Sequence, residues 1–282
     1  MIFLKRLFDF ILFGNIYVAI ATVCLIQSTI IQLEISNHLI FYSALSFFAT
    51  LFIYNLQRIF YSQQKDNSLL SVRRKWIFEN QFFIKSLTII GFLGVSISFF
   101  FNDSKIIFYL SPLLILSVAY FLPAVKLRQN PWFKLLTLAI VWTIVTAVVP
   151  ALLSNVNPFS INAILHFFVR LIFMIGICIP FDIRDMEIDK AENIFTLSQK
   201  FGENKTRWIA FGFMILYIAL IVGEFAIRMF SMKIFIALMI TAIINAIIVF
   251  MSSSKRSEYF YTALLDGTMI LQGIVLVGVN YL

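Results

Sequence analysis

The chain has 282 residues, of which 61% are hydrophobic and only 13% are charged, and its formal net charge is +8. A soluble domain carries about 25% charged residues, so this composition excludes a soluble globular protein and predicts one polytopic membrane domain over residues 1–282. No nucleic acid partner is needed to explain the positive charge, because basic loops beside anionic lipid account for it.

Nine apolar segments are candidates for membrane spans, since a transmembrane helix needs about 20 apolar residues. The first begins after a basic start that resembles a signal peptide, but no small-residue cleavage site follows, so we expect this helix to be retained. The sequence therefore predicts an all-α protein with nine transmembrane helices. They lie near residues 9–31, 39–61, 81–101, 106–123, 135–153, 161–180, 208–227, 233–251 and 259–280.

The basic residues are distributed unevenly between the two sets of predicted loops. The set that includes the N-terminus holds 16 Lys and Arg residues, and the other set holds 3. Because cytoplasmic loops are enriched in Lys and Arg, we predict a cytoplasmic N-terminus and an outside C-terminus, in a bacterial inner membrane. The two long predicted loops, 62–80 and 181–207, are then cytoplasmic, and we expect any polar substrate to be handled there.

An acidic segment interrupts the apolar sequence after Pro180. If this segment is helical, Asp182, Asp185 and Asp189 lie on one helix face, while Arg184 and Glu187 point elsewhere. Three carboxylates on one face repel one another unless a cation or water offsets the charge, and Mg²⁺ prefers such oxygen ligands. The alternative interpretation is a solvated acidic loop between two membrane helices.

The sequence D-I-R-D-x-E-x-D-K, followed by T-L and F-G, resembles the second aspartate-rich motif of the UbiA family of intramembrane prenyltransferases. The resemblance implies a nine-helix enzyme that transfers a prenyl group from an isoprenoid diphosphate to an aromatic or other lipid-soluble acceptor. It implies Mg²⁺ as the cofactor and a catalytic, metal-binding role for Asp182, Asp185 and Asp189. The residues that match the motif are Asp182, Arg184, Asp185, Asp189, Thr196, Leu197 and Gly202.

The first aspartate-rich motif of that family is incomplete in this chain. Asn55 matches its first position, but Ile59 and Gln63 stand where the family has aspartates. Arg58 lies about 60° from Asn55 around the helix, and its guanidinium can bind phosphate through two hydrogen bonds. We therefore predict that Asn55 and Arg58 bind the diphosphate. Alternatively, Arg58 only anchors the helix at the cytoplasmic interface.

A third polar segment lies between the fourth and fifth predicted helices. Tyr120, Lys126 and Arg128 resemble the Tyr…Lys-Arg loop of the same family, which implies that they also bind the diphosphate. Two cations in a loop restrained by Pro123 suit that role. The enrichment of cytoplasmic loops in basic residues predicts the same Lys and Arg without any ligand.

Ionisable groups also occur within the predicted spans, where they are costly and usually face the protein interior. Arg170 and Asp266 are candidates to pair with each other. Asp266, Met269, Gln272 and Gly273 form a stripe that either lines a cavity or packs against a neighbouring helix, and we expect packing. Cys24 and Cys178 lie in apolar runs and are interpreted as core residues.

Two alternatives to a prenyltransferase remain open from the sequence. The missing aspartates of the first motif are compatible with a non-catalytic relative that binds an isoprenoid lipid. Arg170 and Asp266 could instead form an intramembrane relay in a small transporter, although the sequence shows no inverted repeat of the kind many transporters have.

Overall fold

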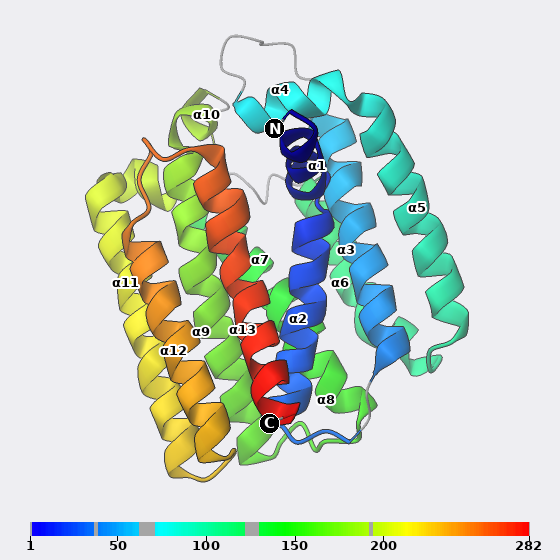
Figure 1. The fold of residues 1–282 in the computed structure, drawn as a ribbon, viewed down its shortest axis with the longest axis vertical. Helices are drawn as coiled ribbons and strands as arrows, with labels where there is room; N and C mark the ends of the chain where they lie inside the picture. Colours follow the sequence, from blue (N-terminus) through cyan, green and yellow to red (C-terminus); the bar gives the residue numbers. More distant parts are fainter. Residues whose placement is uncertain (1, 37–38, 62–70, 122–129, 192–193, 282) are drawn as a thin grey trace.

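The structure is a computed structural model that describes residues 2–36, 39–61, 71–121, 130–191 and 194–281. All regular elements in these ranges are helices, which confirms the predicted all-α class (Figure 1). In the order given next, α marks an α-helix and η marks a π-helix. In chain order the elements are α1 (Ile2–Phe13), α2 (Ile16–Gln32), α3 (Ile40–Tyr61), α4 (Val72–Glu79), α5 (Gln81–Phe100), α6 (Lys105–Phe121), α7 (Pro131–Thr143), η3 (Ile144–Val148), α8 (Val149–Leu153), α9 (Ile161–Arg184), α10 (Met186–Ala191), α11 (Leu197–Ala226), α12 (Met232–Phe250), η4 (Phe260–Leu265) and α13 (Asp266–Tyr281).

The number of membrane spans differs from the predicted nine. Within the described residues, seven continuous helical segments are long and apolar enough to cross a membrane. The pair α1 and α2 is bent by 58° and gives an eighth span if it is counted as one. Helix α6 corresponds to the predicted span 106–123, but the apolar part found among the described residues, Lys105–Ser117, is shorter than a full span. The chain is thus an integral membrane protein, whereas the count of nine spans is not confirmed.

Both long predicted loops contain helices. Helix α4 lies within the loop 62–80, and α10 and the beginning of α11 lie within the loop 181–207. Gly202 separates the first turn of α11 from the long apolar part of this helix, with a φ angle of 77°. This left-handed conformation is readily adopted only by glycine, which explains the residue type at this kink.

Helix α2 packs beside α13, which is distant in sequence, and α9 packs beside α11 (Figure 1). A Cβ atom at Gly273 of α13 would lie 2.6 Å from the carbonyl oxygen of Cys24 in α2, so glycine permits this close contact. The contact confirms that Gly273 serves helix packing. The chain begins at the end of the bundle that carries α4 and α10 and finishes at the opposite end (Figure 1).

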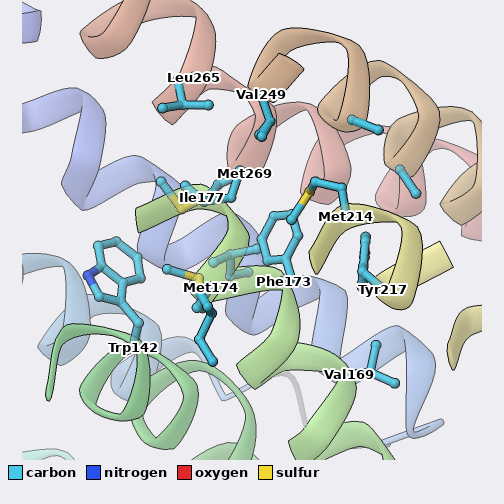
Figure 2. Packing of buried hydrophobic residues seen from close by; sticks show 14 of the residues in the cluster. Trp142, Val169, Phe173, Met174, Ile177, Met214, Tyr217, Val249, Leu265 and Met269 are labelled. Atoms are coloured by element: carbon cyan, nitrogen blue, oxygen red, sulfur yellow. The ribbon is translucent and has the colours of Figure 1, made fainter. Parts of the chain in front are cut away.

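The largest buried apolar cluster holds α9 against α11, α12 and α13 and extends to Trp142 of α7 (Figure 2). Phe173 of α9 and Tyr217 of α11 belong to this cluster, with ring centroids 5.0 Å apart. Aromatic pairs at this distance stabilise packing beyond the buried area alone. The cluster fixes α9, whose C-terminal end carries the acidic segment.

The bend between α1 and α2 is held by two asparagines. Asn15 has a φ angle of 61°, a conformation that Asn adopts more readily than most residues. Its side chain donates a hydrogen bond to Oδ1 of Asn55 at 3.0 Å, and Nδ2 of Asn55 donates to the carbonyl oxygens of Gly14 and Leu51. Asn55 is completely buried and therefore links α3 to this bend.

Candidate active site

A cavity of about 710 Å³ lies inside the bundle, and residues of α4 and α10 line one part of it. Most of its wall is apolar and includes Leu45, Phe99, Leu110 and Trp142. The charged and amide-bearing wall residues include side chains from α3, α4, α7, α9, α10 and α13. They include Gln57, Arg58, Arg73, Arg74, Lys134, Asp182, Arg184, Asp185, Asp189 and Asp266.

The acidic segment does not form the single continuous helix that the sequence predicted. Helix α9 ends at Arg184, Asp185 is its C-terminal capping residue, and Asp189 belongs to the separate helix α10. The side chains still reach the same cavity, because the turn at Asp185 redirects the chain. Glu187 is exposed, as expected for a residue outside the site.

Lys134 of α7 joins two of the three aspartates. Its Nζ lies 2.8 Å from Oδ1 of Asp182 and 2.9 Å from Oδ2 of Asp189, and all three side chains are at most 10% exposed. The backbone N–H of Leu197 donates to the second oxygen of Asp182 at 3.4 Å. Burial raises the pKa of Asp189, and the charge of Lys134 offsets only part of that effect.

Arg184 holds the third aspartate. Its Nε and Nη2 donate to Oδ1 and Oδ2 of Asp185, both at 2.7 Å, which is the bidentate geometry of a strong ion pair. Burial alone would raise the pKa of Asp185, but the charge and hydrogen bonds of Arg184 outweigh it and hold this pKa well below its usual range. The guanidinium also lies 4.8 Å from the ring centroid of Phe181. The expectation that Arg184 points away from the site was wrong.

Arg58, Arg73 and Arg184 form an arginine cluster around the same end of the cavity. Burial and the neighbouring charge of Arg184 lower the pKa of the Arg73 guanidinium. Glu258 lies 3.9 Å from Nε of Arg73 and 3.8 Å from Nη1 of Arg184. Burial opposes ionisation of Glu258, but these two arginines outweigh it and lower its pKa. The carboxylates of Asp185 and Glu258 are therefore close to this cluster, and Asp266 of α13 also interacts electrostatically with all three guanidinium groups.

The remaining predicted site residues have different positions. Arg58 lines the cavity as expected, whereas the side-chain amide of Asn55 is used in the bend between α1 and α2. Its role as a diphosphate ligand stays a prediction. Tyr120 belongs to the last turn of α6, but its side chain lies outside the described part of the chain. Lys126 and Arg128 lie outside the described residues, so their roles also stay predictions.

The predicted pair of Arg170 and Asp266 is not formed. Nη2 of Arg170 donates to the carbonyl oxygen of Leu25 and to the hydroxyls of Ser28 and Thr29, at 3.2 to 3.3 Å. Asp266 instead lines the large cavity together with Met269, so this stripe serves both the cavity and helix packing. This separation removes the structural basis for the alternative of an intramembrane transport relay.

The arrangement combines an apolar chamber with a cationic end, and the sequence matches the model of the UbiA prenyltransferase family over residues 79–262. The chain belongs to the UbiA prenyltransferase family. Two solved structures are similar over nearly the whole chain. One, from work on a digeranylgeranylglyceryl phosphate synthase in membranes, is 17% identical, with 99% of this chain and 100% of that chain covered and a TM-score of 0.56.

The other similar structure is a UbiA homologue from Aeropyrum pernix K1 in its apo form. It is 12% identical, with 95% of this chain and 96% of that chain covered and a TM-score of 0.64. None of the curated proteins compared with the chain matches it. At these identities the two structures establish the fold of this UbiA protein and not its substrates.

UbiA prenyltransferases generally use Mg²⁺, and the carboxylates of this chain do not fit a metal cluster as they stand. Both oxygens of Asp185 are bonded to Arg184, and Asp182 and Asp189 each direct one oxygen at Lys134. No group of three His, Cys, Asp or Glu side chains with a metal-binding arrangement occurs among the described residues. A divalent ion can use Asp182 and Asp189 together only if the Lys134 ammonium moves away.

Lys134 and Arg73 are the site residues that sequence reasoning missed. Both were interpreted as ordinary basic residues of cytoplasmic loops. Helical periodicity offered a signal in each case, because Lys134 lies on the same face of α7 as Leu138 and Val141, which line the cavity. Arg73 likewise shares a face of α4 with the buried Ile77.

Proposed function

We propose that this UbiA protein transfers a prenyl group from an isoprenoid diphosphate to an aromatic or other lipid-soluble acceptor within the membrane. The observation that supports the proposal is that one cavity joins the arginine cluster to a large apolar wall. An isoprenoid diphosphate has the same division into an anionic head and an apolar tail. Residues 1–282 act as one domain in this proposal, because residues from α1 to α13 line the cavity.

In the proposed complex, the diphosphate lies against Arg58, Arg73 and Arg184, and the prenyl tail lies along the apolar wall. Fixed guanidinium groups stabilise the negative charge that develops on the diphosphate when its bond to the prenyl C1 carbon breaks. The bonding electrons leave with pyrophosphate, and the resulting allylic cation is attacked by the acceptor, which then loses a proton. The predicted Tyr120, Lys126 and Arg128 would bind the same leaving group.

The acidic residues have two proposed roles. Asp185 orients Arg184 through its bidentate ion pair, which is present in the structure. Asp182 and Asp189 hold Lys134 at the cavity wall. The prediction that Asp182, Asp185 and Asp189 bind Mg²⁺ requires these cations to exchange for the metal, and Mg²⁺ would then neutralise the leaving diphosphate.

The direct test is prenyl transfer by purified protein in lipid nanodiscs. Isoprenoid diphosphates of several chain lengths are offered with a panel of quinone precursors, haem and polar lipids, with and without Mg²⁺, and products are identified by mass spectrometry. A prenylated product with release of pyrophosphate is expected. Tight binding of the isoprenoid without any product across the panel would favour the non-catalytic lipid-binding alternative.

We also propose an orientation of the chain in a bacterial inner membrane. The charged end of the cavity would face the cytoplasm, together with the N-terminus, α4 and α10, and Leu282 would be outside. A reporter fused after Leu282 should be active only outside the cytoplasm, and one inserted at Lys200 only inside. A cytoplasmic C-terminal reporter would contradict this orientation.

A further inference from the structure

The ammonium group of Lys134 contacts two buried carboxylates at once. The ammonium is within 2.9 Å of both Asp182 and Asp189, which come from different helices, so three elements converge on one cation. Two nearby carboxylates repel each other strongly unless a positive charge lies between them. In this chain the lysine supplies that charge from within the protein.

The rest of the site follows the same pattern of fixed cations. Arg184 binds both oxygens of Asp185. The α3 wall carries Arg58 and lacks a carboxylate at position 59, where isoleucine stands. Each of the three aspartates Asp182, Asp185 and Asp189 is thus already bonded to a protein cation, and α3 adds the guanidinium of Arg58.

The arginine cluster also retains unused hydrogen-bond donors. Nε of Arg58, Nε of Arg73 and Nη1 of Arg184 are buried and have no hydrogen-bond partner among the described residues. The side chains of Arg73 and Arg184 are only 10% exposed. The three arginines line the cavity, and Glu258 lies 3.8 to 3.9 Å from two of these donor atoms. The positive charge of the cluster is what an anionic ligand in the cavity would meet.

We propose that Lys134 takes the place of a divalent metal ion, so that the site binds a diphosphate head group directly and without Mg²⁺. The inference rests on the proposed function and specifies how its substrate is held. The Lys134 ammonium and the arginine cluster supply the positive charge, and Asp182 and Asp189 keep the ammonium in position. Direct binding by protein cations predicts an affinity that does not depend on divalent ions.

The first experiment uses the unmodified protein in nanodiscs. Binding of inorganic pyrophosphate and of a non-hydrolysable farnesyl thiodiphosphate is measured by calorimetry in EDTA and again with excess Mg²⁺. We expect the dissociation constants in the two conditions to agree within about threefold, which is a small difference on the scale of tenfold per 1.4 kcal/mol. If farnesyl thiodiphosphate binds only in the presence of Mg²⁺, the inference is overturned and the proposed function stays intact.

Absence of farnesyl thiodiphosphate binding in both conditions would instead contradict the proposed function as well. The two failures are therefore distinguishable in a single titration series. Because this experiment needs no substitution, it does not depend on the folding of a variant. Melting curves recorded in both buffers verify that EDTA does not unfold the protein.

A second experiment removes the lysine charge through Lys134→Met. This change leaves Asp182 and Asp189 facing each other, so Mg²⁺ gains two carboxylate ligands. We expect pyrophosphate binding in EDTA to weaken at least about 30-fold, on the scale of one lost preorganised charged contact, and excess Mg²⁺ to restore most of it. A merely structural role for Lys134 would not produce rescue by the metal.

Lys190→Met is the matched control, because Lys190 is an exposed lysine of α10 next to Asp189. Its affinity for pyrophosphate should equal that of the unmodified protein in both buffers. If Lys134→Met fails to fold, Lys134→Gln offers a polar replacement with the same loss of charge. Unchanged pyrophosphate binding in EDTA by either folded Lys134 variant would overturn the inference.

Discussion

The two buried polar regions along α9 show that buried charge alone does not mark a functional site. The first is the arginine cluster with its aspartates at the C-terminal end of α9. The second, an inner polar cluster, consists of Thr29, His166, Arg170, Glu224 and Gln272. Arg170 and Arg184 are separated by about 21 Å along the helix at 1.5 Å per residue.

The two clusters differ in the space around them. The arginine cluster opens into the cavity of about 710 Å³, whereas the inner polar cluster encloses no room for a water molecule. Nη2 of Arg170 donates hydrogen bonds to Leu25, Ser28 and Thr29 of α2. The inner cluster therefore cross-links α2, α9, α11 and α13, and only the arginine cluster can admit a ligand. The predictions below test this division.

The largest effect is expected from Arg170→Met, which should reduce the stability of the protein. Removal of one member of a buried ionic network costs about 3–5 kcal/mol, because the remaining polar groups stay buried without compensation. We expect a lower melting temperature and an unchanged pyrophosphate affinity of the folded protein. Lys233→Met, at an exposed position of α12, is the control and should have little effect on either quantity.

A weakened pyrophosphate affinity of folded Arg170→Met would show that the two clusters are coupled. A melting temperature equal to that of the unmodified protein would show that Arg170 does not support the fold. Either result would break the proposed division between a stabilising cluster and a ligand-binding cluster.

The next effect is expected from Arg58→Gln, which should weaken binding and spare stability. Loss of one preorganised donor costs about 2–4 kcal/mol, which corresponds to roughly 30- to 1,000-fold in the pyrophosphate dissociation constant. Arg58→Lys should restore the affinity only in part, since lysine cannot make the bidentate contact. Lys75→Gln, which removes an exposed positive charge from α4, is the control. Unchanged binding by Arg58→Gln would make Arg58 an interfacial anchor only.

The sequence predicted the fold class and the position of the acidic segment because both depend on local patterns. Long apolar runs indicate membrane helices directly, and Asp182, Asp185 and Asp189 are close together in the chain. The bend at Asn15 and the turn at Asp185 were not predicted, and the bend depends on a contact with a distant residue. Asn15 is held by Asn55, which lies 40 positions away.

The cations of the site were less predictable than its acids. Lys134 precedes Asp182 by 48 positions, and Arg73 meets Glu258 only through the packing of α4 near η4. Enrichment of basic residues in cytoplasmic loops explains such residues equally well without any site. Only the three-dimensional arrangement distinguishes Lys134, which contacts two aspartates, from an exposed cation such as Lys190.

A smaller effect on stability is expected from Gln272→Leu in the inner polar cluster. Nε2 of Gln272 donates to Oγ of Ser28 at 3.2 Å, while its Oε1 has no hydrogen-bond partner in the described part of the chain. Loss of one neutral hydrogen bond should cost about 1 kcal/mol in the free energy of unfolding. Chemical unfolding in detergent measures the change, and pyrophosphate affinity should stay constant. A loss as large as that of Arg170→Met would contradict this ranking.

The smallest effect, and the only gain in affinity, is expected from Glu258→Gln. Glu258 is one of the carboxylates close to the arginine cluster, and it repels an anionic ligand bound there. Removal of a like charge several ångströms away is worth about 0.7 kcal/mol under strong screening, or roughly threefold tighter pyrophosphate binding.

The sign of this change separates two roles of Glu258. If it acts mainly through its charge, Glu258→Gln strengthens pyrophosphate binding, and the effect shrinks as salt concentration rises. If it mainly positions Arg73 and Arg184, the same variant weakens binding at every salt concentration. Glu187→Gln removes an equal charge from an exposed position of α10 and should leave the affinity unchanged. A gain from Glu258→Gln that is absent from Glu187→Gln would place the anion beside the arginine cluster, because a general change in net charge would affect both variants alike.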